Sequence, residues 1–149
     1  DLSTMYTTLP LVDLKQRMRA LVERVFAWHF DATRMRVLLV RADGSHSWVS
    51  CREEGDSRRM FFDSRTLCDM IDVLVSNTFV TFGGHIYQQI VGIPMGTNCA
   101  GFLANLYCFT YELEFFERLV ARHEFTLARE FNGCMRYIDD LLCIDAPRF

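Results

Sequence analysis

The sequence predicts an α+β fold in which helices back antiparallel hairpins. Two stretches, Pro10–Val25 and Asn98–Arg122, have the length and apolar content of helices. Three other stretches place a turn between two short runs of strand-forming residues, as β-hairpins do. Because a hairpin pairs neighbouring strands in opposite directions, we expect antiparallel sheets.

Composition indicates one globular unit over residues 1–149. Half of the 149 residues are apolar and 13% are aromatic, which is enough to bury a sizeable core and too much for a disordered tail. No run of about 18 apolar residues occurs, so we expect no membrane span. The first methionine is Met5, and no secretion signal opens the chain. We therefore expect the chain to be a piece of a longer protein.

Charge and cysteine content exclude few classes of function. The chain has 16 basic and 19 acidic residues, and this net charge of −3 does not by itself indicate a nucleic-acid binder. Every basic residue except Lys15 is arginine, which suits bidentate contacts to phosphate, although surface salt bridges explain it equally well. The six cysteines lack metal-ligand spacing and favour a reducing, intracellular compartment.

The first elements follow from periodicity and turn chemistry. A helix is predicted to begin at Pro10, because proline suits the first helical position and apolar residues then recur every three or four positions. Residues 36–49 are predicted to form a hairpin, since Asp43-Gly44 is a tight-turn signal between short apolar runs. Residues 51–60 are polar and charged, and are predicted to form a flexible loop.

A second helix and hairpin follow. Asp63 or Ser64 can cap a helix that continues to about Ser76, because short polar side chains accept bonds from the free amides of a first turn. Residues 78–90 read as another hairpin, turned by a pair of glycines.

The last third of the chain combines a long helix with a final hairpin. The predicted helix over residues 98–122 is apolar nearly all round until Tyr111 and charged afterwards, which suggests burial at its start and exposure at its end. Residues 134–144 form two short β-prone runs with Asp139-Asp140 at the turn between them.

Asp139-Asp140 is the first candidate for chemistry. Two carboxylates about 4 Å apart repel each other by roughly 4 kcal/mol at an effective dielectric constant near 20. A solvated turn accommodates such a pair, because aspartate is a common turn residue. The alternative is a divalent-metal site with hard oxygen ligands, which needs a further carboxylate.

Asp1 is the candidate for that further carboxylate. It opens a segment that leads directly into the first predicted helix, where an acidic side chain would project at a sheet edge. A helix-capping role explains the same segment. A third segment, residues 92–100, contains glycines and a proline before the long helix, where backbone and ligand can approach closely and free amides can bind an anion.

Together the three segments resemble the ordered motifs of reverse transcriptases, most closely those of the Penelope-like retroelements, a group akin to telomerase. The order is an aspartate with a tyrosine five residues later, a glycine- and proline-containing turn into a long helix, and a Tyr-x-Asp-Asp hairpin. The matching residues are Asp1, Ser3, Tyr6, Thr7 and Pro10; Phe82, Gly84, Tyr87, Gln89, Gly92, Met95 and Gly96; Ala104-Asn105-Leu106; Tyr111-Glu112; and Arg136-Tyr137-Ile138-Asp139-Asp140.

The resemblance implies a polymerase palm, an antiparallel sheet backed by helices, with part of the fingers. It implies an RNA-directed DNA polymerase core that adds deoxynucleotides to a primer 3′ end by two-metal phosphoryl transfer. The implied cofactors are two Mg²⁺ ions, for which Mn²⁺ can substitute. The implied partners are an RNA template, a DNA primer and deoxynucleoside triphosphates, and the implied compartment is the nucleus.

The resemblance also assigns residues. Asp1, Asp139 and Asp140 would be the catalytic carboxylates and metal ligands. The substrate-binding residues would be Leu2, Tyr6, Gly92, Met95 and Gly96. In this set the Leu2 carbonyl would face a metal, the Tyr6 ring would exclude a ribose 2′-hydroxyl, and the last three residues would lie along the nascent base pair and template.

Two alternatives stay open at the level of sequence. One is a catalytically silent palm that binds nucleic acid or serves in assembly. The other is an RNA-directed RNA polymerase palm, against which Tyr6 argues because such an enzyme must accept a ribose hydroxyl. We expect the isolated 149-residue chain to be inactive, because the nucleotide-binding fingers residues and the thumb would lie outside it.

Overall fold

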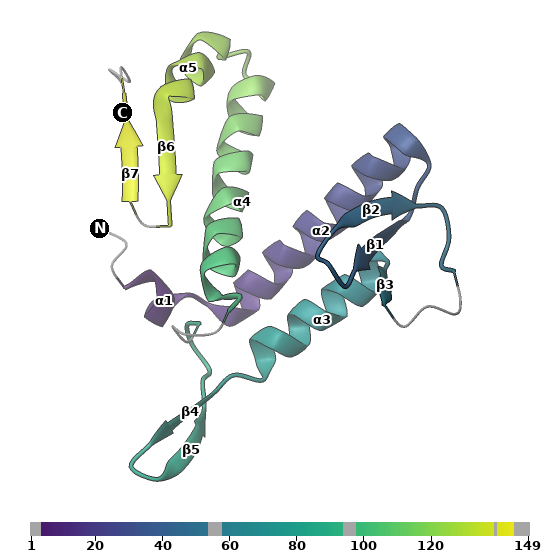
Figure 1. The fold of residues 1–149 in the computed structure, drawn as a ribbon. Helices are drawn as coiled ribbons and strands as arrows, with labels where there is room; N and C mark the ends of the chain where they lie inside the picture. Colours follow the sequence, from purple (N-terminus) through teal and green to yellow (C-terminus); the bar gives the residue numbers. More distant parts are fainter. Residues whose placement is uncertain (1–3, 54–57, 94–97, 139, 145–149) are drawn as a thin grey trace. The chain divides into compact units, whose positions relative to one another are not determined.

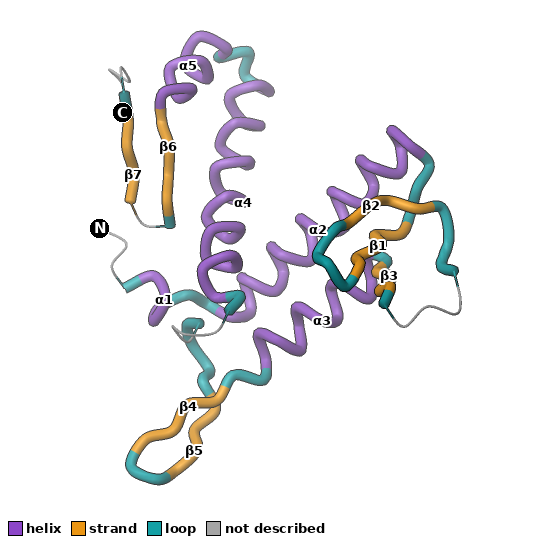
Figure 2. Tube along the Cα trace, in the orientation of Figure 1, coloured by secondary structure: helices purple, strands orange, loops and turns teal. Residues whose placement is uncertain are grey.

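The computed structural model describes residues 4–53, 58–93, 98–138 and 140–144 (Figure 1). The chain divides into two compact units, one of residues 1–14 with 78–149 and the other of residues 15–77. Helices alternate with small antiparallel sheets in the described residues, which confirms the α+β class (Figure 2). No helix among these residues is long and apolar enough to cross a membrane.

The unit of residues 15–77 contains a three-stranded sheet in the order β2-β1-β3. Its strands are β1 (Val37–Arg41), β2 (His46–Val49) and β3 (Arg59–Phe62). The predicted hairpin over residues 36–49 is confirmed, and Gly44 adopts the positive φ of 82° that its turn requires. The loop predicted over residues 51–60 is wrong at its end, because Arg59 and Met60 pair with β1. A polar segment can form such an edge strand once a neighbour supplies the hydrogen-bonding ladder.

Two helices pack in this unit. Most of α2 (Leu11–Thr33) runs antiparallel to α3 (Ser64–Ser76), as the contacts between them show. Lys15 Nζ donates to Ser76 Oγ at 3.0 Å, and one turn later Arg19 Nη2 donates to Asp72 Oδ2 at 2.6 Å. The buried side chains of the unit include Met18, Phe26, Val37, Leu39, Cys68 and Val75. Both predicted helices are confirmed to within one residue of their expected starts.

The other unit is built around α4 (Ala100–Ala121). Its remaining elements are α1 (Met5–Thr8), β4 (Phe79–Phe82), β5 (His85–Gln88), α5 (Phe125–Glu130), a short 3₁₀ turn (Phe131–Gly133), β6 (Cys134–Tyr137) and β7 (Asp140–Cys143). The β4–β5 and β6–β7 hairpins confirm the two predicted from sequence. Neither α1 nor α5 was predicted, because each is too short to show a periodic pattern.

The prediction that α4 is buried at its start and emerges at its end is wrong. Phe102, in the first turn, is 74% exposed, whereas Leu119, near the last, is 4% exposed. Burial follows one face of α4 along its whole length, and the fully or nearly buried positions are Ala100, Leu103, Ala104, Thr110 and Leu119. Composition failed here because an apolar side chain does not reveal which face of a helix a neighbour covers.

The cap of α3 yields a stability prediction. Asp63 Oδ1 accepts a bond of 2.8 Å from the Thr66 amide, and this bond holds the pKa of Asp63 below its ordinary value. We expect Asp63→Ala to cost about 1 kcal/mol in the free energy of unfolding, measured by urea denaturation at pH 7. Asp63→Asn keeps the capping oxygen and is the matched control, with a loss of only a few tenths of a kcal/mol.

The lowered pKa fixes the sign of the pH dependence. The folded chain binds the Asp63 proton less tightly than the unfolded chain, so this contribution is complete above the ordinary carboxyl pKa of about 3.9. It is lost as the pH falls through the lower folded pKa. The gap in stability between wild type and Asp63→Ala should therefore shrink on acidification, and a gap that widens would contradict the cap.

Candidate functional site

Three of the predicted site residues lie in the described part of the chain: Tyr6 in α1, Gly92 before α4, and Asp140 at the start of β7. The other five lie outside the described residues; they are Asp1, Leu2, Met95, Gly96 and Asp139. The described neighbours of these positions define the site.

Gly92 packs directly against residues 5–9, that is α1 and the residue after it, which we call the α1 segment. Its amide donates to the Leu9 carbonyl at 2.8 Å, and the next amide, of Ile93, donates to the Tyr6 carbonyl at 2.7 Å. A Cβ at Gly92 would lie 2.4 Å from that same Tyr6 carbonyl oxygen, and the residue has a φ of +78°. Glycine is therefore required at this position for two reasons, space and backbone conformation.

The α1 segment also packs against the first half of α4. The Tyr6 hydroxyl lies 3.8 Å from the point where Gly101 would carry a Cβ, so the half-buried Tyr6 ring reaches the first turn of α4. Met5 is 8% exposed, and its sulfur lies 3.3 Å from the Cys108 sulfur. Burial raises the pKa of the Cys108 thiol, so this thiol stays protonated and uncharged beside the Met5 sulfur.

Two tyrosines of α4 hold the start of α2. The hydroxyls of Tyr107 and Tyr111 both donate to Asp13 Oδ2, at 2.6 and 2.9 Å. Burial, followed by the bond to Asp13, raises the pKa of Tyr107, so this hydroxyl stays protonated. The chain leaving the α1 segment is thereby held to α4 as well.

Arg136 holds the β6–β7 hairpin to α4. Its Nε and Nη2 donate to the two carboxylate oxygens of Glu112, and its Nη1 donates to Asn105 Oδ1 at 2.8 Å. Nη2 also donates to the Asn105 carbonyl at 3.1 Å. The side chain of Arg136 is only 13% exposed, and the bond to Glu112 raises the pKa of the guanidinium. A paired, bidentate arginine of this kind fixes orientation as well as position.

The network of Arg136, Glu112 and Asn105 also holds the turn of the hairpin. Ile138 has a φ of +57°, a left-handed conformation that is rare for a β-branched residue and costs of order 1–3 kcal/mol. Its amide donates to Asn105 Oδ1 at 3.0 Å, and its carbonyl accepts from Arg136 Nη1 at 3.0 Å. Both polar groups of the strained peptide are therefore satisfied by the network that anchors it to α4.

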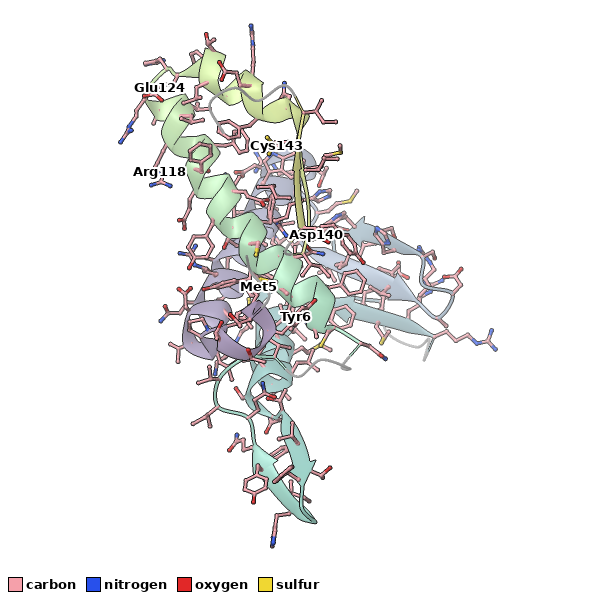
Figure 3. All side chains as sticks on the ribbon, turned by 90° about the vertical axis from the view of Figure 1, so that its left-hand side faces the viewer. Met5, Tyr6, Arg118, Glu124, Asp140 and Cys143 are labelled. Atoms are coloured by element: carbon pink, nitrogen blue, oxygen red, sulfur yellow. The ribbon has the colours of Figure 1, made fainter. Side chains whose placement is uncertain are left out.

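The residues on either side of the turn project to solvent. Tyr137 pairs with Asp140 across the hairpin, Tyr137 is 72% exposed, and Asp140 is also exposed. An aspartate in this position keeps its carboxylate open to a ligand. In Figure 3 the Asp140 end of the hairpin is the end nearer to Met5 and Tyr6, whereas Cys143 lies at the far end. Figure 1 likewise shows the end of β6 and the start of β7 on the side of α1.

One stripe of α4 receives the contacts of Met5, Tyr6 and the β6–β7 hairpin. Gly101, Asn105, Cys108 and Glu112 follow one another at intervals of four, three and four residues, which places them on one face of a helix. Tyr6 meets the first of them, Ile138 and Arg136 the second, Met5 the third and Arg136 again the fourth. We call these four residues the α4 stripe. The α1 segment and the β6–β7 hairpin, at opposite ends of the chain, thus meet on a common support.

Sequence reasoning assigned no role to Asn105, Glu112 or Arg136. A signal was present, because Asn105 is a polar residue in the mainly apolar first half of the helix, and Glu112 follows two turns later on the same face. Such a pair on one face indicates a buried polar partner. Nothing in the sequence, however, identified that partner as an arginine of the hairpin.

The described residues contain no group of three or more His, Cys, Asp and Glu side chains close enough to hold a metal ion. Two of the three predicted carboxylate ligands lie outside these residues. Comparisons of the chain with protein-family models, curated proteins and solved structures found no match.

Asn105 tests whether the network positions the turn. Asn105→Ala removes the acceptor shared by Arg136 and Ile138, and we expect it to cost about 1–3 kcal/mol because it leaves part-buried donors unpaired. Amide hydrogen exchange at Ile138 should accelerate in the same variant. Asn105→Asp keeps an acceptor oxygen and is the matched control, with Ile138 still protected. Equal protection in the alanine variant would show that the network does not hold the turn.

Proposed function

We propose that this chain is the palm core of an RNA-directed DNA polymerase. The observation that carries the proposal is the shared support: the segment after Asp1 and the hairpin that contains Asp139-Asp140 both contact the α4 stripe. Gly101 and Cys108 lie about 10 Å apart along the helix axis. Two segments that must bring carboxylates together for metal-dependent phosphoryl transfer are thus both tied to one short stretch of helix.

In this proposal Asp1, Asp139 and Asp140 are the catalytic carboxylates. Three carboxylates are a donor set that suits Mg²⁺, and Asp140 is exposed at the start of β7 as a ligand needs to be. Mg²⁺ bound in such a site would activate the primer 3′ hydroxyl and would neutralise charge on the transferring phosphoryl group. The Leu2 carbonyl would be a further oxygen donor to the same ions.

The described residues have distinct roles in this proposal. Arg136 and Asn105 hold the strained Ile138 peptide, so that Asp140, at the start of β7, would need little reorganisation during the reaction. Tyr6 is positioned at both ends: its carbonyl accepts from the Ile93 amide, and its hydroxyl lies 3.8 Å from the Cβ position of Gly101. A ring held in this way can exclude a 2′-hydroxyl from the incoming sugar. Gly92, Met95 and Gly96 would contact the nascent base pair and the template.

The proposed reaction is tested by primer extension. We expect Asp139→Asn, in the full-length protein that carries this chain, to lower deoxynucleotide addition on an RNA template by about a hundredfold or more. Asp31→Asn is the matched control, because Asp31 is exposed and makes only a surface ion pair with Arg34 at 3.8 Å. Template binding by gel shift should be unchanged in both variants. Undiminished extension by Asp139→Asn would refute the catalytic assignment.

Sugar discrimination tests Tyr6 and separates a DNA from an RNA polymerase. The wild-type protein should prefer deoxynucleotides, and Tyr6→Ala should lower the ratio of kcat/KM for deoxynucleotides to that for ribonucleotides by about tenfold or more. Tyr6→Phe keeps the ring and should keep the preference. Equal use of both nucleotides by the wild-type protein would favour the RNA-directed RNA polymerase instead.

A further inference from the structure

Cys134 and Cys143 lie directly opposite each other at the end of the β6–β7 hairpin away from the turn. The Ile144 amide donates to the Gly133 carbonyl at 3.0 Å, so the pair just outside them is a hydrogen-bonded pair. Hydrogen-bonded and non-hydrogen-bonded pairs alternate along an antiparallel ladder. The two cysteines therefore occupy a non-hydrogen-bonded pair, the kind in which opposing side chains come closest.

This position has the geometry that a disulfide needs. Opposing Cα atoms in a non-hydrogen-bonded pair are about 4.5 Å apart, within the range of about 4.4–6.8 Å found across disulfides. Gly133 permits the close approach of the strands, because a Cβ there would lie 2.2 Å from the Ile144 carbonyl oxygen. Both side chains project to the same face of the hairpin, as directly opposed residues do.

The two thiols already interact. Burial, together with a hydrogen bond to Cys134, raises the pKa of the Cys143 thiol to about 11. Cys134 also lines a cavity of about 660 Å³ between α4 and the hairpin, together with Phe115, Phe131 and Leu141. A small oxidant in this cavity can reach the Cys134 sulfur while Cys143 stays protonated beside it.

We propose that Cys134 and Cys143 are a redox modification site, which a peroxide converts to a cross-strand disulfide. The Cys134 thiolate attacks a peroxide oxygen; an S–O bond forms, the O–O bond breaks and hydroxide leaves. The Cys143 sulfur then attacks the Cys134 sulfur; the S–S bond forms, the S–O bond breaks, and the departing hydroxide takes up the Cys143 proton as water. In total two thiols lose two electrons and two protons, and hydrogen peroxide becomes two waters.

The other described cysteines are placed differently. Cys108 contacts the Met5 sulfur, and Cys68 is buried among the helices of the other unit. Cys99 is half-buried at the N-cap of α4, away from the hairpin strands in sequence. Cys51 is exposed and serves as a control position. Oxidation should therefore select the hairpin pair, and the cross-link should close the hairpin around the Tyr137–Asp140 turn. The inference does not depend on the proposed polymerase function.

The test is peptide mapping of the oxidised chain. Trypsin cleaves after Arg136, so the two cysteines fall in different peptides, Glu130–Arg136 and Tyr137–Arg148. After hydrogen peroxide treatment and alkylation of remaining thiols, non-reducing digestion should yield these two peptides joined, and dithiothreitol should separate them. Cys134→Ser and Cys143→Ser should each abolish the joined peptide, whereas Cys51→Ser should retain it.

A second measurement does not depend on how the variants fold. In the wild-type chain, oxidation should slow amide hydrogen exchange within the hairpin by about tenfold or more, because a cross-link opposes local opening. Recovery of the two cysteines as separate sulfinic acids, as alkylated thiols, or joined to other cysteines would overturn the proposal. Unchanged exchange in a chain that carries the joined peptide would overturn its proposed effect on the hairpin.

Discussion

The contact between Arg136 and the α4 stripe is the interaction on which the rest of the candidate site depends. A guanidinium that is 13% exposed must be paired, because an uncompensated charge in that position is costly. Glu112 supplies the charge, and Asn105 supplies an acceptor that Arg136 shares with the Ile138 amide. The same few atoms therefore anchor the hairpin and stabilise its strained turn.

The strained backbone of Ile138 indicates that the conformation of this turn is held by its surroundings. A left-handed β-branched residue persists only where its surroundings over-determine it, and such residues cluster at sites where a geometry must be held. Here the residue immediately precedes Asp139-Asp140. A turn of glycine or asparagine would form the same hairpin without strain, so the network has to stabilise a turn that the local sequence disfavours.

The α1 segment reaches α4 by a different physical route. Its contacts with α4 are apolar or steric, with Met5 against Cys108 and the Tyr6 hydroxyl close to Gly101. Before α4, the Gly92 backbone lies directly against Tyr6 and Thr7. Close backbone approach replaces charge pairing, and it depends on glycines. The hairpin, by contrast, has a polar anchor at its turn and a cysteine pair at its other end. The proposed oxidation would therefore cross-link the two strands at the end that lies away from the aspartates.

The sequence by itself determined the local elements. Helix periodicity, the Asp63 cap and the turn signals at Asp43-Gly44 and Gly83-Gly84 predicted both long helices, α3 and three hairpins, because each of these signals acts over a few neighbouring residues. The order of motifs likewise identified Tyr6, Gly92 and Asp140 as candidates, and for these the assignment to a polymerase site stays a prediction.

Only the tertiary structure decided which distant segments contact each other. The pairing of Arg59–Phe62 with β1 depends on residues 18 to 24 positions earlier in the sequence, and the burial pattern of α4 depends on which segments cover it. The roles of Asn105, Glu112 and Arg136 required knowing that residues on a helix and on a later strand face each other. Such contacts are set by packing between distant segments, which no local propensity encodes.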